Sequence, residues 1–117
     1  MHRLWRATIN SWNGLRVVVR SEEAFRQELI VLVISVPLAY LVATSAWRRL
    51  TLVLVIVLIM IVELLNTAIE KLCDRVSPEY DPRIGFVKDL GSAAVGLALL
   101  FAAAVWLLAL AERLGLV

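Results

Sequence analysis

The sequence contains very few of the residues on which soluble enzymes commonly build catalytic or metal sites. Cys73 is its only cysteine and His2 is its only histidine. A single cysteine excludes an intrachain disulfide, a thiolate metal cluster and a dithiol redox pair. A single histidine at the start of the chain argues against a histidine-based triad or a zinc site. We interpret Cys73 as a small apolar side chain at an interface.

Glycine is also scarce, and the known nucleotide-binding loops depend on it. None of the five glycines belongs to a G-x-x-x-x-G-K-[ST] loop or to a G-x-G-x-x-G loop. The sequence therefore lacks the loops that usually hold the phosphates of a nucleotide. The net charge is only +2, and no feature of the chain indicates nucleic-acid binding.

Charge is missing from long stretches of the chain. Residues 29–47 form a run of 19 uncharged residues and residues 90–111 a run of 22, and a helix of either length crosses a hydrocarbon layer roughly 30 Å thick. Residues 50–62 are too short a run to span unless the helix continues to about Leu72. Because 62% of the residues are hydrophobic, we predict an all-α membrane protein rather than a soluble one. Its single domain, residues 1–117, has spans at about 29–47, 50–72 and 90–111.

The basic residues indicate how the spans are oriented. Nine of the twelve lie in residues 1–28 and 71–90, and only Arg48, Arg49 and Arg113 flank the opposite ends. By the positive-inside rule, this distribution predicts that the N-terminus and the second loop are cytoplasmic.

The segments outside the spans have patterns of their own. Residues 2–27 place apolar side chains at helical spacing and most polar ones elsewhere, which predicts an amphipathic helix on the membrane surface. Residues 77–86 contain two prolines and a glycine and predict a water-facing loop. Asp89 is the predicted N-cap of the third span. Small residues just after it favour close helix contact; they are Gly91, Ser92 and Gly96.

The second span carries a row of polar residues where a membrane helix usually has only hydrocarbon. Glu63, Asn66, Glu70 and Asp74 fall at roughly 0°, 300°, 340° and 20° around a helix. They therefore share one face, and that face has to meet protein or water. A charge at the centre of a span costs roughly 3 kcal/mol on insertion scales, so these residues need a partner or a use.

Two interpretations of this polar face remain open from the residues alone. The first is that it joins helices, with Asn66 forming an interhelical hydrogen bond and Glu63 protonated and inactive. The second is an acid/base and metal site. Glu63, the deepest, would act as a general base, while Glu70 and Asp74, nearer water, would hold a divalent cation.

Other charged residues belong to the same predicted membrane face. Glu22 and Glu28 are acidic residues near a helix end, and such residues are usually solvated. Lys88 either anchors the third span or, with the start of that helix, favours phosphate binding. Each signal is weak alone, and their shared cytoplasmic side is what favours a site.

Four segments closely resemble the small bacterial integral-membrane diacylglycerol kinases: SWNGLR, EAFRQE, IVELLNTAIEKLCDR and KDLGSAAV. The resemblance covers nearly the whole chain. It implies a homotrimeric bundle of an N-terminal surface helix and three transmembrane helices in the bacterial inner (cytoplasmic) membrane. It also implies a lipid kinase that uses ATP and Mg²⁺ to convert diacylglycerol to phosphatidic acid.

The resemblance also implies a role for individual residues. Glu63 matches the catalytic base, and Asn66 helps to order the site. Glu22 and Glu70 match the ligands of the divalent metal and so hold ATP. Lys88 and Asp89 contact the nucleotide, surrounded by Arg3, Glu79, Tyr80 and Asp81. The lipid is received by Arg3, Trp12, Arg16, Ala24, Phe25, Arg26, Gln27, Glu28, Glu63 and Ser92.

The chain departs from the family pattern at two positions. Asp81 stands where the best-known members have a histidine, and Asn10 stands where they have a tyrosine at the edge of the nucleotide. Both departures concern peripheral contacts to ATP. The central residues match the pattern: Glu63, Asn66, Glu70, Lys88 and Asp89.

Three other functions are weighed against a diacylglycerol kinase. An undecaprenol kinase shares the ELLNTAIE core, although EAFRQE and KDLGSAAV favour diacylglycerol. A small transporter or pore would use the carboxylates as an ion path, but the segment LTLVLVIVLIM, residues 50–60, has nothing to conduct ions with. A purely structural role predicts that Glu63→Gln leaves activity unchanged.

Overall fold

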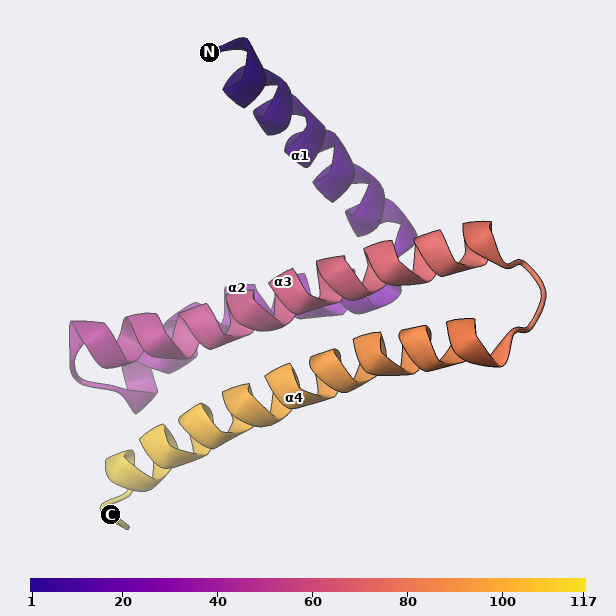
Figure 1. Ribbon diagram of the computed structural model, residues 1–117. Coiled ribbons are helices and arrows are strands. Elements are labelled where there is room, and N and C mark those ends of the chain that lie inside the picture. The colour runs from indigo at the N-terminus through magenta and orange to yellow at the C-terminus, as the bar shows by residue number, and fades with distance from the viewer.

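The computed structural model describes all 117 residues, and every regular element in it is a helix. In chain order the helices are α1 (His2–Ser21), α2 (Glu23–Val42), α3 (Ala46–Val76) and α4 (Pro82–Arg113). Helices α2, α3 and α4 lie side by side, whereas α1 projects away from the end where α3 and α4 are joined (Figure 1).

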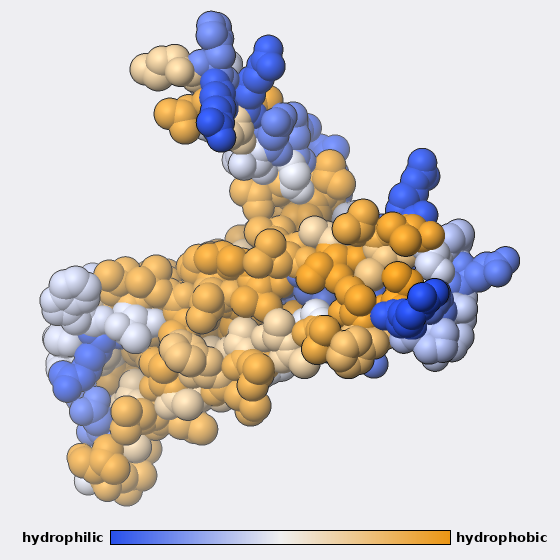
Figure 2. Space-filling view, viewed as in Figure 1, coloured by the Kyte–Doolittle hydropathy of each residue, from blue (hydrophilic) through white to orange (hydrophobic).

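The structure confirms the predicted number of helices that could span a membrane. Helices α2, α3 and α4 are each long and apolar enough to cross a bilayer. On the face shown in Figure 2, apolar side chains form a belt along the bundle, and hydrophilic side chains gather at its two ends. This is the distribution expected of a protein that spans a hydrocarbon layer.

The prediction of one helix over residues 2–27 is wrong at its C-terminal end. Helix α1 ends at Ser21, because Glu22 is extended, with φ −113° and ψ 110°. The guanidinium of Arg26 donates hydrogen bonds to the carbonyl oxygens of Val19 and Arg20, at 3.0 and 2.8 Å. These bonds satisfy acceptors that the end of α1 leaves free and fix the turn into α2.

The first predicted span, residues 29–47, also ends earlier than expected. Helix α2 stops at Val42. Ser45 then caps α3, where its hydroxyl oxygen accepts the backbone N–H of Arg48 at 3.2 Å. A side-chain oxygen at this position compensates one of the free N–H groups at a helix start, so the chain turns here and Trp47 belongs to α3.

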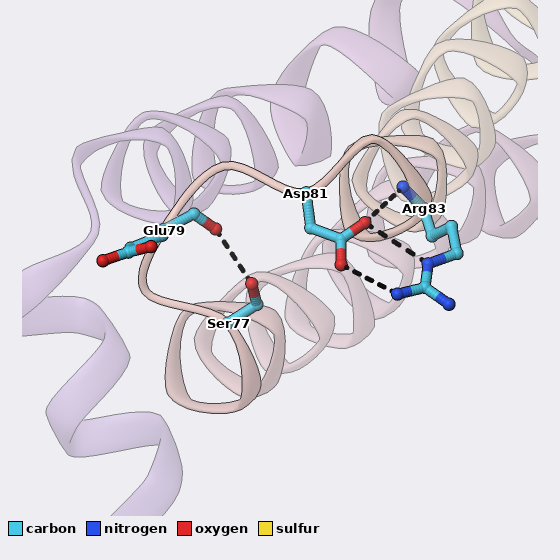
Figure 3. Close-up of polar contacts among 4 residues, drawn as sticks. All are labelled: Ser77, Glu79, Asp81 and Arg83. Atoms are coloured by element: carbon cyan, nitrogen blue, oxygen red, sulfur yellow. Dashed lines mark hydrogen bonds and ion pairs between the residues drawn. The ribbon is translucent and has the colours of Figure 1, made fainter.

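Helix α4 begins at Pro82, not near Asp89 as the sequence predicted. Its N-cap is Asp81, whose carboxylate accepts the backbone N–H of Arg83 at 2.9 Å and also contacts the Arg83 guanidinium (Figure 3). These hydrogen bonds hold the pKa of Asp81 below its usual range. The loop is thereby shortened to residues 77–81, within which the Ser77 hydroxyl donates to the carbonyl oxygen of Glu79 at 2.8 Å (Figure 3).

Helix α3 is the centre of the bundle. It packs against both α2 and α4, which make few contacts with each other. The indole N–H of Trp106 on α4 donates to the carbonyl oxygen of Leu52 at 3.1 Å. Three small groups of buried side chains hold the helices together: Val55, Ile56, Ile59, Ala98 and Ala102; Ala39, Ala43 and Leu52; and Val18, Phe25 and Met60.

Only 15 of the 117 residues are buried. A soluble protein with so small a core would leave most of its apolar side chains in water, which the hydrophobic effect opposes. The exposed apolar surface of α2, α3 and α4 therefore has to meet lipid or protein.

The close contact between α2 and α3 gives a test of this packing. Ala39 is only 1% exposed and lies against Leu52, so Ala39→Leu has to force the helices apart. We expect it to lower the free energy of unfolding by about 1–3 kcal/mol. Unfolding in detergent micelles measures this change. Leu41→Ala is the control, because Leu41 is 69% exposed, and equal stability of the two variants would contradict the packing.

Candidate active site

The polar face of α3 points toward the junction of α1 and α2 and toward the start of α4. Glu63 and Glu70 are half-buried, as are Glu22 at the junction and Glu28 on α2. The carboxylate of Glu63 is near enough to those of Glu70, Glu22 and Glu28 for their charges to interact. The fold thus gathers four carboxylates, from segments far apart in the sequence, at one end of the bundle.

Asn66 is the buried polar residue at the centre of this group. Its side chain is 8% exposed, and its amide Nδ2 donates to Oε1 of Glu70 at 3.2 Å. The carbonyl oxygen Oδ1 is buried and accepts no hydrogen bond within the chain. Buried polar atoms are usually bonded, but this oxygen lies against Gly91 of α4, which leaves it without a hydrogen-bond donor in the chain.

Helix α4 approaches Asn66 through a glycine. A Cβ atom added to Gly91 would lie far inside van der Waals contact with Oδ1 of Asn66. The structure therefore confirms the predicted close helix contact at Gly91, but not at Gly96, where an added Cβ would meet nothing within 4 Å. No other residue type fits at position 91 without displacing the Asn66 amide.

Two ion pairs join the carboxylates to the neighbouring segments. Nζ of Lys71 lies 3.2 Å from Oε1 of Glu22, which connects α3 to the α1–α2 junction. Nζ of Lys88 lies 2.6 Å from Oδ1 of Asp74, which connects α4 to the last turns of α3. Lys88 is also near enough to Glu70 for their charges to interact.

A divalent cation fits the donors at this end of the bundle. The structure has no group of three or more histidine, cysteine, aspartate or glutamate side chains arranged as a metal site. Magnesium, however, is commonly bound through one or two carboxylates together with substrate phosphates and water. Glu22 and Glu70 supply carboxylate oxygens of this kind. Only Oε1 of Glu22 faces Lys71 in the ion pair.

The structure brings together six of the residues that the sequence proposed for the site: Glu22, Glu28, Glu63, Asn66, Glu70 and Lys88. Oε1 of Glu28 is buried and without a hydrogen-bond partner in the chain. Like Oδ1 of Asn66, it is an acceptor that the fold itself does not use.

Other proposed residues have structural contacts or lie elsewhere. Phe25 is 3% exposed and packs in the core, and Arg26 holds the end of α1. Gln27 donates to Glu23 at 3.5 Å, and Asp81 caps α4. The remaining proposed residues are exposed and are not brought to the carboxylates by a contact: Arg3, Trp12, Arg16, Ala24, Glu79, Tyr80, Asp89 and Ser92. Arg3 lies in the first turn of α1, at the end of that helix which projects away from the bundle (Figure 1).

The sequence did not identify Lys71 as part of this site. Lys71 follows Glu70 directly, and neighbouring positions of a helix point about 100° apart. Lys71 therefore lies outside the polar face that helical spacing defines from the sequence. Only the position of Glu22 beside α3 shows that Lys71 faces a carboxylate.

Comparisons with known proteins identify a matching family and several relatives of the chain. The family model for prokaryotic diacylglycerol kinase matches residues 9–110. The diacylglycerol kinase of Escherichia coli (strain K12) is 40% identical over 97% of this chain and 93% of its own length. That of Pseudomonas aeruginosa (strain PAO1) is 41% identical over 91% of this chain and 86% of its own length. The chain belongs to the prokaryotic diacylglycerol kinase family. Membership confirms that it is a kinase of lipid metabolism with transmembrane helices.

The contact between Gly91 and Asn66 predicts a selective loss of activity in this kinase. Gly91→Ala has to displace the Asn66 amide and with it Glu70. Misplacing a positioning group by about 1 Å costs up to about 100-fold in rate, so we expect a loss between about tenfold and 100-fold in lipid phosphorylation.

Gly96→Ala is the matched control, because a Cβ at Gly96 meets nothing within 4 Å. It makes the same substitution on the same helix, five positions further along. Thermal unfolding of both variants in detergent shows whether each remains folded. Similar activities for two folded variants would mean that the position of Asn66 does not matter.

Proposed function

We propose that the chain transfers the γ-phosphoryl group of ATP to the free hydroxyl of diacylglycerol, giving phosphatidic acid. The observation that carries this proposal is the cluster of four carboxylates around Glu63, on a membrane helix of a chain that belongs to this kinase family. The lipid hydroxyl lies at headgroup depth, so a base that serves it has to lie on a membrane helix just below the surface.

Glu63 is the general base in this proposal. A Glu63 carboxylate oxygen takes the proton from the lipid hydroxyl, whose oxygen bonds to the γ-phosphorus of ATP. The bond from that phosphorus to the β–γ bridging oxygen breaks, and ADP leaves. Phosphoryl transfer depends mainly on positioning and on charge neutralisation, so the protein needs no covalent intermediate and no P-loop.

The neighbouring residues position the reactants. Asn66 orients Glu70 through its amide hydrogen bond. Glu22 and Glu70 hold a divalent cation, Mg²⁺, which shields the charge of the ATP phosphates. Lys88 adds positive charge at the water side of the cluster, with Asp89 beside it on α4.

The peripheral residues define where each substrate enters. Helix α1 exposes Leu4, Trp5 and Trp12, at 70%, 67% and 64%. Exposed apolar side chains on one amphipathic helix are suited to the membrane interface, which supports a lipid-binding role for this helix and for Arg16. The exposed loop residues Glu79 and Tyr80 flank the nucleotide side. Phe25 and Arg26 act by holding α1 and α2 together.

Assembly and orientation complete the proposal. The small core and the half-exposed carboxylates of the single chain favour a homotrimer, in which neighbouring copies cover the polar face of α3. The basic residues near the same end favour a cytoplasmic location for the site in a bacterial inner membrane. ATP is available on that side.

The first test compares the wild type with Glu63→Gln. We expect Mg-ATP and diacylglycerol in mixed micelles to give phosphatidic acid with the wild type, and the variant to be at least about 100-fold slower, the usual contribution of a general base. Glu23→Gln is the matched control, because Glu23 is exposed and only contacts Gln27. Both variants have to keep the oligomeric state of the wild type.

Undecaprenol is assayed in parallel as the alternative lipid. A preference for undecaprenol would replace diacylglycerol as the substrate but leave the role of Glu63 intact. Full activity of a folded Glu63→Gln variant would exclude Glu63 as the base.

A second test addresses the metal. Glu22→Gln removes one carboxylate from the cluster, and we expect it to raise the half-saturating Mg²⁺ concentration by at least about tenfold, because even outer-shell partners of metal ligands contribute that much to affinity. Glu23→Gln should leave the Mg²⁺ dependence unchanged. If Glu22→Gln instead alters only the ATP dependence, the role of Glu22 lies with the nucleotide and not the metal.

A further inference from the structure

A polar pocket lies at the end of the bundle opposite the carboxylates. The end of α2, the connection to α3 and the last turns of α4 enclose a volume of about 210 Å³. Its polar lining consists of Thr44, Arg48, Glu112 and Arg113. None of these residues takes part in the proposed kinase site.

The groups that the fold leaves without partners in this pocket are hydrogen-bond donors. Nε and Nη2 of Arg48 face the two oxygens of Glu112, at 3.3 and 3.4 Å, which occupies the single carboxylate. The Arg113 guanidinium and the Thr44 hydroxyl have no side-chain hydrogen bond or ion pair in the chain. With two guanidinium groups and one carboxylate, the pocket has a net positive charge and selects an anion with several acceptor oxygens.

Arg113 is not needed to complete the end of α4. The carbonyl oxygens of Leu110, Ala111 and Glu112 already accept backbone N–H groups from residues 114–116. Gly115, with φ +75°, allows this turn. The guanidinium is therefore free to bind a ligand in the pocket.

The pocket lies at the depth of lipid headgroups. Trp47 is 79% exposed and Tyr40 is 63% exposed, and the Arg49 guanidinium lies 4.2 Å from the centroid of the Tyr40 ring. Exposed tryptophan, tyrosine and arginine residues at the ends of spans are typical of the membrane–water interface.

An adjoining groove leads from the pocket into the span. It shares Arg48, Ala109 and Glu112 with the pocket and continues past Thr51, Leu52, Val105 and Leu108. The last three are apolar, and the Thr51 hydroxyl already donates within α3 to the carbonyl oxygen of Trp47 at 2.8 Å. A ligand with an anionic head and a hydrocarbon chain fits this combination, whereas free phosphate would use only the pocket.

We propose that this site binds an anionic phospholipid of the opposite leaflet. The phosphate oxygens accept hydrogen bonds from Arg113, Thr44 and the remaining donors of Arg48, and one acyl chain lies in the adjoining groove. The phosphate is held from both sides, by Thr44 directly after α2 and by Arg113 on α4. The site does not depend on the proposed kinase function.

Native mass spectrometry of the full chain in a neutral detergent tests the proposal. Phosphatidylglycerol is titrated into the wild type and into Arg113→Gln, and we expect the variant to bind one such lipid per chain about tenfold more weakly, the loss expected for charge-assisted hydrogen bonds. Thr44→Val, which preserves side-chain shape, should weaken the same binding to a smaller extent. Arg75→Gln is the matched control, because Arg75 is an exposed arginine at the opposite end of α3.

Two further ligands distinguish the occupant. Phosphatidylcholine, whose ammonium group offsets its phosphate, should bind the wild type more weakly than phosphatidylglycerol. Inorganic phosphate should not displace the lipid. Equal binding of phosphatidylglycerol to the wild type and to both pocket variants would overturn the proposal, as would displacement of the lipid by inorganic phosphate. Kinase activity in the same detergent shows that the variants are folded.

Discussion

Carboxylates on a membrane helix have to be kept out of hydrocarbon, and this requirement governs the arrangement around α3. An isolated charge in the bilayer costs several kcal/mol, so the polar face of α3 has to contact other polar groups. The fold places the α1–α2 junction against Glu63 and brings Gly91 of α4 directly onto Asn66. Lys71 and Lys88 then bring positive charge to the rim. The contacts that cover the polar face of α3 therefore also assemble the candidate site.

The number of spans and the polar face of α3 could be predicted because both depend on local sequence. A charge-free run determines a span, and spacing alone places Glu63, Asn66 and Glu70 on one side. The helix ends could not be predicted in the same way. Helix α1 stops at Ser21 because a side chain from the next helix, Arg26, bonds back to its carbonyl oxygens. No propensity argument selects that contact over a continuous helix of residues 2–27.

In the candidate site, too, the sequence indicated individual residues but not the contacts between residues that are far apart in the chain. Resemblance to a family assigned roles to residues, but it did not show which side chains meet. The Lys71–Glu22 and Lys88–Asp74 pairs depend on how the helices are rotated against each other. Phe25 illustrates the converse, because it lies in a segment expected to receive the lipid yet is buried in the core. The position of a residue in such a segment did not show whether its side chain contacts the substrate or supports the fold.

The charge of the site explains why nucleotide and metal have to bind together in the proposed reaction. The carboxylates of Glu22, Glu28, Glu63 and Glu70 form an acidic cluster that would repel the phosphates of ATP. Lys71 and Lys88 bring positive charge to the rim, but they are paired with Glu22 and Asp74, and Glu28, Glu63 and Glu70 have no ion pair of their own. A divalent cation between the carboxylates and the phosphates changes the sign of the interaction, since each group then faces a positive charge. In the proposed reaction, this acidic site would therefore select the metal complex of the nucleotide over the free nucleotide, without any glycine-rich loop.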